Sequence, residues 1–144
     1  MDISSYEDRY RDDLIRLVAE FYDEALNEWS APVDRDRLLQ TIEEHKHNVL
    51  ILIINGKCEG VLAGVVVQSP LNGEKVYQEM IWYVSRAHRL NGVRFLKACE
   101  ARIKEAGITQ FIMALMANSK ADKLKRLYER MNFKLFESHY IKQL

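Results

Sequence analysis

Apolar residues in the first third of the chain recur every three or four positions, which is the period of an amphipathic helix. The pattern predicts one helix over residues 11–29 and a second from about 34 to 46, with Asp34 near its start. Residues 2–6 are expected to form a short first strand. The apolar positions of the first predicted helix are Leu14, Leu17, Val18, Phe21, Tyr22, Ala25, Leu26 and Trp29.

The pattern then changes to short β-branched runs separated by turn residues. The run at 49–54 is continuously apolar, which is typical of a strand covered on both faces. It is followed by Asn55-Gly56, a pair that favours a tight hairpin turn. Further runs at 61–67 and 76–84 predict two more strands. We expect these three strands to form an antiparallel meander.

The second half of the chain alternates between the two periods. Residues 92–106 and 119–131 carry helical stripes, and the runs at 111–116 and 133–141 read as strands. Asn132 stands where a helix often ends in a left-handed residue. The predicted order is therefore β-α-α-β-β-β-α-β-α-β, an α/β fold with a mixed central sheet and helices on both faces.

Composition narrows the classes of function. A length of 144 residues, of which 48% are hydrophobic, is typical of one globular domain over residues 1–144. Lys and Arg number 21 and Asp and Glu also number 21, so the basic excess of a general nucleic-acid binder is missing. No apolar run approaches a membrane span. Cys58 and Cys99 fit no metal-binding spacing, and we expect no metal and a cytoplasmic location.

Several segments together carry a resemblance to a known family. They are Gln78-Glu79-Met80-Ile81-Trp82-Tyr83-Val84 in the third meander strand, His88-Arg89 before the next helix, and residues 121–133, where a tyrosine on a helix precedes Asn132-Phe133. With the predicted order of elements, these segments resemble the GNAT family of acyl-CoA-dependent N-acyltransferases. They look most like the small members encoded by bacteriophages.

The resemblance implies an activity. A GNAT-like enzyme transfers an acetyl group from acetyl-CoA, used as a co-substrate, to an amine that attacks the thioester directly in a ternary complex. The acceptor is expected to be a small-molecule or peptide amine, with no nucleic-acid or membrane partner. The location is expected to be the cytoplasm, or the host cytoplasm if the chain is phage-encoded. A homodimer through the last predicted strand stays open.

The family binds the CoA pyrophosphate at the start of the helix that follows the meander. Here Arg89 matches the first basic residue and Gly92 matches a glycine, but Leu90 stands where a glycine is expected and the loop is about two residues shorter. We expect the side chains of Arg86, Arg89 and Arg94 to replace lost backbone contacts. The alternative is a solvated basic surface. The residues assigned to the pyrophosphate are Arg89, Asn91, Gly92, Val93 and Arg94.

Two residues are assigned to proton transfer. Tyr128 matches the family tyrosine that protonates the CoA thiolate, although its helical stripe also suits a core tyrosine. Glu79 is the candidate base, because a carboxylate inside an apolar strand is unusual and burial would raise its pKa. Two alternatives stay open: Gln78 is the inward residue instead, or Glu79 faces solvent.

The remaining assignments concern acetyl and pantetheine contacts. Tyr83 and Val84 match the stretch whose main-chain groups bind these parts of acetyl-CoA in the family. Asn118 is a candidate for a pantetheine hydrogen bond, or else a helix cap. A different class of function also stays open. The altered phosphate loop is what a non-catalytic GNAT-fold component would show, for example a phage virion or assembly protein that has lost CoA binding.

Overall fold

A computed structural model describes residues 1–118 and 120–144. Ser119, at which the fourth predicted helix was expected to begin, lies outside the described residues. Two compact units make up the described chain, one from Met1 to Ala114 and the other from Leu115 to Leu144. Among the described residues, no helix has both the length and the apolar character that a membrane crossing needs.

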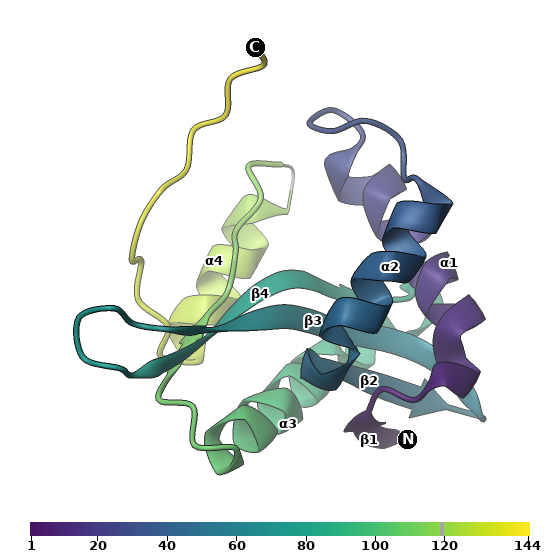
Figure 1. Ribbon diagram of the computed structural model, residues 1–144, viewed down its shortest axis with the longest axis horizontal. Coiled ribbons are helices and arrows are strands. Elements are labelled where there is room, and N and C mark those ends of the chain that lie inside the picture. The colour runs from purple at the N-terminus through teal and green to yellow at the C-terminus, as the bar shows by residue number, and fades with distance from the viewer. Residues whose placement is uncertain (119) are drawn as a thin grey trace. The chain divides into compact units, whose positions relative to one another are not determined.

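The first unit is built on a five-stranded sheet with the order β1-β2-β3-β4-β5 (Figure 1). The first four strands pair antiparallel, and β5 joins β4 in parallel. The predicted meander and the mixed sheet are thus confirmed, and the short first strand exists. The strands are β1 (Asp2–Ser5), β2 (Val49–Ile54), β3 (Lys57–Gln68), β4 (Lys75–Val84) and β5 (Gln110–Ile112).

Helices cover both faces of this sheet. In Figure 1, α1 and α2 lie on one side of the strands and α3 lies on the other. The first predicted helix changes from α to π geometry after Phe21, so it divides into two elements. The helices of the unit are η1 (Asp8–Tyr10), α1 (Arg11–Phe21), η2 (Tyr22–Leu26), α2 (Arg35–His45), η3 (Lys46–Asn48), η4 (Arg86–Asn91) and α3 (Gly92–Glu105).

The sheet separates two apolar cores. Ile51 points into the core beneath α1 and α2, whereas Leu52 points into the core beneath α3. The same alternation divides Tyr83 from Val84 at the end of β4. Successive side chains of a strand face opposite sides, so each strand contributes to both cores. This explains why the run at 49–54 is continuously apolar.

Turn residues adopt the conformations that the sequence predicts. Asn55 and Gly56 have φ angles of 51° and 77°, which closes the hairpin between β2 and β3. Asn132, with a φ of 66°, follows the last helix in the left-handed region. Asp34 accepts a hydrogen bond from the Arg37 N–H at 2.9 Å and caps α2.

Within its described residues, the second unit contains one helix, α4 (Ala121–Arg130), followed by an extended tail. The prediction of a strand over 133–141 is wrong, because the structure describes these residues and assigns none of them to a strand. Leu135, Phe136 and Tyr140 are exposed there. An alternating pattern provides a potential apolar face but no hydrogen-bonding neighbour, and a strand requires both. Strand β5 is also shorter than the predicted run at 111–116.

Candidate functional site

Strand β4 contains a bulge next to the candidate base. Ala63 pairs with Ile81 and Gly64 pairs with Glu79, so Met80 is the extra residue on β4. A bulge bends its strand and redirects the neighbouring side chains. The irregularity therefore lies beside Glu79, in the half of β4 that leads to η4.

Gly64 permits the close approach of β3 and β4 at this bulge. A Cβ atom at this position would lie 2.6 Å from Cε1 of Tyr77 and would also overlap the carbonyl oxygen of Gln78. Tyr77 is buried, and its hydroxyl donates to the Asn48 carbonyl oxygen at 2.6 Å, so its ring is held in place. Because Gly64 has no side chain, β3 and β4 can approach each other closely here. This close approach fixes the backbone position of Glu79.

Glu79 is half-buried and faces the chain that follows β5. Its Oε2 atom accepts a hydrogen bond from the Ala114 N–H at 2.9 Å. Gln78, the alternative inward residue, is exposed. Burial raises the pKa of Glu79 to about 7, while hydrogen bonds from the backbone of Ala114 and Trp82 act in the opposite direction. A carboxylate with this pKa is suited to accept a proton near neutral pH.

The position of Glu79 is also the point where pairing of β4 with β5 stops. Their register runs from Val76 opposite Gln110 to Gln78 opposite Ile112. Beyond Gln78, strand β4 continues to Val84, whereas β5 has ended. The side chain of Glu79 therefore makes its contact with Ala114 just past the last paired residues.

Strand β4 ends at Tyr83 and Val84, which are both buried. The Tyr83 hydroxyl lies 2.9 Å from Oε1 of Glu24 and 3.2 Å from Oε2 of Glu20. Burial and the Glu24 carboxylate raise the pKa of Tyr83 to about 12, so the hydroxyl keeps its proton as a donor. The Tyr83 hydroxyl thus connects the end of β4 to the helical segment that carries Glu20 and Glu24.

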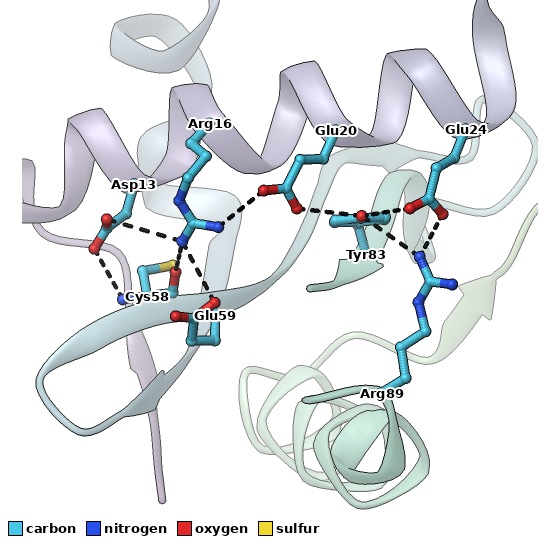
Figure 2. A network of polar contacts seen from close by, with 8 residues as sticks. All are labelled: Asp13, Arg16, Glu20, Glu24, Cys58, Glu59, Tyr83 and Arg89. Carbon is cyan, nitrogen blue, oxygen red and sulfur yellow. Dashed lines mark hydrogen bonds and ion pairs between the residues drawn. The ribbon is translucent and has the colours of Figure 1, made fainter. Parts of the chain in front are cut away.

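Glu24 is the shared partner of several polar groups at this end of the sheet (Figure 2). It lies in η2, a π-helical turn, and such turns often occur at functional sites. Arg89 forms an ion pair with Oε2 of Glu24 through Nη2, and the same nitrogen lies 3.5 Å from the Tyr83 hydroxyl. Arg86 approaches Glu24 at 3.5 Å but is mostly exposed. Three elements, η2, β4 and η4, therefore meet at one carboxylate.

A second group of contacts continues along α1. Arg16 bonds Glu20 at 3.1 Å, Glu59 at 3.4 Å and the Cys58 carbonyl oxygen at 2.9 Å (Figure 2). Asp13 accepts from the Cys58 N–H at 3.0 Å. These contacts attach α1 to the start of β3, and α1 leads directly into η2, which carries Glu24.

The segment predicted to hold pyrophosphate is a 3-10 helix that continues into α3. Backbone groups within it are already bonded: the His88 N–H donates to Ser85 at 2.9 Å and the Gly92 N–H donates to Arg89. Gly92 has a helical φ of −58°, and Asn91 holds the N-cap position of α3 without a capping hydrogen bond from its side chain. An anion here would therefore meet side chains more readily than a loop of open amide groups.

The other predicted phosphate residues point outward. Val93 and Arg94 are exposed in the first turn of α3. Leu90, which stands where a glycine is expected and is not one of the predicted phosphate residues, is fully exposed in η4. The first unit thus places Glu79, the end of β4 and the arginines that follow it in one continuous stretch of chain.

Tyr128 and Asn118 belong to the second unit. Tyr128 is half-buried on α4, and its ring lies 5.6 Å from that of Phe133. The Phe133 N–H donates to the Tyr128 carbonyl oxygen at 2.9 Å. Asn118 accepts from the Lys120 N–H at 2.9 Å, so its side chain takes part in the turn before α4.

The sequence reasoning missed Glu20 and Glu24. Their spacing of four residues on the polar side of the predicted helix was the available signal. That signal is common on solvated helices, and only the structure shows that the two carboxylates meet Tyr83.

Comparison with known families gives one match. The model of the acetyltransferase (GNAT) family matches residues 12–133 of the chain. This range includes β4, η4, α3 and α4. No curated protein matches the sequence.

Solved structures agree on the fold. A ribosomal-protein-alanine N-acetyltransferase from Brucella melitensis biovar Abortus 2308 is 18% identical, with a TM-score of 0.77 over 99% of this chain and 98% of that one. An aminoglycoside acetyltransferase from an uncultured soil metagenomic sample, in complex with sisomicin, is 15% identical, with a TM-score of 0.76 over 99% and 95%. A putative acetyltransferase from Agrobacterium tumefaciens is 10% identical, with a TM-score of 0.74 over the whole of both chains. At these identities the likeness shows a shared fold.

Proposed function

Because the chain belongs to the acetyltransferase (GNAT) family, we propose that it transfers an acetyl group from acetyl-CoA to an amine by direct attack in a ternary complex. The observation that carries this proposal is Glu79, a half-buried carboxyl whose pKa is raised to about 7 at the point where β5 ends beside β4. A general base with such a pKa is matched to amine deprotonation near neutral pH.

The proposed mechanism contains two proton transfers, one from the amine and one to the sulfur. Acetyl-CoA supplies an activated thioester. Glu79 accepts the proton that the amine loses as its nitrogen bonds to the acetyl carbon. Tyr128 donates the proton that the sulfur gains as the carbon–sulfur bond breaks, a role taken from the family motif. The products are an amide and free CoA.

The residues present fit an anionic phosphate through side chains. Arg86, Arg89 and Arg94 supply positive charge around the start of α3, and the amides of His88 and Gly92 are used internally. Arginine binds phosphate through paired N–H groups, so it can replace part of a backbone nest. In this proposal Asn91, Gly92 and Val93 line the phosphate, main-chain groups of Tyr83 and Val84 bind the acetyl carbonyl and pantetheine, and Asn118 is a further pantetheine contact.

The acceptor in this proposal is a small-molecule or peptide amine. Two of the structural neighbours are named for such acceptors, a ribosomal-protein alanine and an aminoglycoside. The buried cysteines are both free, which suits a reducing cytoplasm. The resemblance to small bacteriophage-encoded members stays a prediction.

Calorimetric titration with acetyl-CoA, with CoA as a comparison, tests the proposal. We expect micromolar binding that weakens when Arg89 is replaced by alanine, and CoA release when an amine acceptor is added. Absence of binding up to millimolar acetyl-CoA would contradict it. That outcome would favour the second candidate, a non-catalytic GNAT-fold component, for which the specific observation is the internally bonded 3-10 helix at 86–91.

Replacing Tyr128 with phenylalanine is expected to lower kcat by about 10- to 100-fold, because the proton donor to the leaving sulfur is lost. The affinity for acetyl-CoA should stay nearly constant, since the ring and its contact with Phe133 are retained. Steady-state kinetics and titration on the same preparation measure both quantities. Replacing Tyr140, which is exposed in the tail, with phenylalanine is the matched control. Unchanged turnover in Y128F would rule out the acid role.

A further inference from the structure

Among the described residues, Arg89 is held through a single nitrogen of its guanidinium. A guanidinium carries five N–H donors on three nitrogens. Within residues 1–118 and 120–144, the ion pair and hydrogen bonds of Arg89 all use Nη2, which meets Glu24 and the Tyr83 hydroxyl. Figure 2 shows the other terminal nitrogen directed away from Glu24. The N–H groups of Nη1 are therefore available to a ligand, and the Arg89 side chain is 36% exposed.

The carboxylate that holds Arg89 is itself fixed. Glu24 is 21% exposed, and its Oε1 atom lies 2.9 Å from the hydroxyl of Tyr83. Tyr83 is buried, and its ring packs against Phe21 with centroids 6.1 Å apart in an edge-on arrangement. The chain of contacts thus runs from the core beneath α1 to the guanidinium. Little rotamer freedom is left to Arg89 along this path.

We propose that Glu24 is a positioning residue, which holds Arg89 by Nη2 so that Nη1 faces a phosphate group of the co-substrate. The inference rests on the proposed function, because it requires that the chain binds CoA. A hydrogen bond from a guanidinium to a phosphate oxygen is charge-assisted and about twice as strong as one between neutral groups. An arginine already fixed in that orientation loses less conformational entropy on binding than a mobile one.

The position of Glu24 depends on the π-helical turn of η2. Glu20 and Glu24 both reach the Tyr83 hydroxyl, but of these two only Glu24 also bonds Arg89. The two carboxylates therefore share the Tyr83 hydroxyl but differ in their cationic partners: Glu20 pairs with Arg16, whereas Glu24 pairs with Arg89 and lies 3.5 Å from Arg86.

A double-mutant cycle tests the proposal by calorimetric titration with acetyl-CoA. The proteins are the wild type, E24Q, R89A and the variant that carries both changes, with E20Q as the control. We expect E24Q to weaken binding about tenfold and E20Q to change it less than about twofold. In the R89A background, E24Q should have an effect below about twofold, because a residue that acts through Arg89 has no role once Arg89 is gone.

The outcomes distinguish failure of the positioning role from failure of the proposed function. Wild-type binding with equal or tighter binding by E24Q would overturn the positioning role and leave the proposed function intact. An equal loss in both backgrounds would also overturn it, since a general structural effect of E24Q does not depend on Arg89. Absence of wild-type binding would overturn the proposed function, and the positioning role with it. Thermal unfolding of each variant confirms that all the proteins compared are folded.

Discussion

Replacing Glu79 with glutamine is expected to lower kcat about 10²–10⁴-fold, because the amide has nearly the same shape but cannot accept a proton. Binding of acetyl-CoA should change little. In the wild type, kcat/KM should rise with pH through the pKa of Glu79 at about 7 and then level, since the ionised carboxylate is the active form. Measurement of CoA release across this range, for both proteins, gives the profile.

The same substitution has an opposite effect on stability. Burial raises the pKa of Glu79 from 4.5 to about 7, so the folded protein binds a proton more tightly than the unfolded chain does. The stability this provides is fully present below a pH of about 4.5 and is lost as the pH rises through about 7. The loss is roughly 3 kcal/mol at most, from about 1.4 kcal/mol for each pKa unit. Above neutral pH, E79Q should therefore unfold at a higher denaturant concentration than the wild type.

The combination of lower turnover and higher stability in E79Q distinguishes a catalytic loss from a folding defect. Glu100 is exposed on α3, and Glu100→Gln serves as a control that should change neither turnover nor unfolding. Full turnover in E79Q would assign the base elsewhere. A pH profile without a rise near 7 in the wild type would argue against the role even if the variant were impaired.

Gly64→Ala is expected to destabilise the protein by roughly 1–3 kcal/mol, the usual cost of forcing extra atoms into a packed site. The added methyl group would meet the Gln78 carbonyl oxygen and the ring of Tyr77, which itself is held by Asn48. To relieve these overlaps, β4 would have to move away from β3 beside Glu79. Urea unfolding measures the loss of stability, and turnover should fall with it because the base is displaced.

Gly92→Ala is the matched control for unfolding. Its Cβ atom would lie 3.8 Å from the Trp82 ring, an ordinary contact, and its backbone is already helical. Alanine in a helix is favoured over glycine by roughly 0.5–1 kcal/mol, so this variant should be as stable as the wild type or more so. Unfolding of G64A at the wild-type denaturant concentration would contradict the prediction, because β3 and β4 would then have room for the added methyl group.

Much of the fold was predictable because local rules and burial agree. The continuous apolar run at 49–54 predicted a strand covered on both faces, and Ile51 and Leu52 lie in different cores. Asn55-Gly56 predicted the hairpin, since few other residue pairs tolerate two left-handed conformations. The prediction of a strand at 133–141 is wrong because an alternating pattern specifies which face of a strand is apolar but does not provide a partner strand.

The candidate site was predictable to a smaller extent. A carboxylate in an apolar strand pointed to Glu79, but its contact with Ala114 depends on where β5 ends. The bulge at Met80 has no local signature, because it arises from the register between two strands. The place of Glu24 depends on a change from α to π geometry that the apolar spacing did not reveal.

The two cysteines lie in different cores, and this gives the protein a pair of internal chemical probes. Cys58 belongs to the core beneath α1 and α2, and Cys99 to the core beneath α3. Both are fully buried, and burial raises the pKa of each thiol, so neither reacts while its layer is closed. The rate at which a thiol reagent labels each cysteine therefore reports how often each layer opens. A ligand that fixes η2 to β4 should slow labelling of Cys58 more than labelling of Cys99.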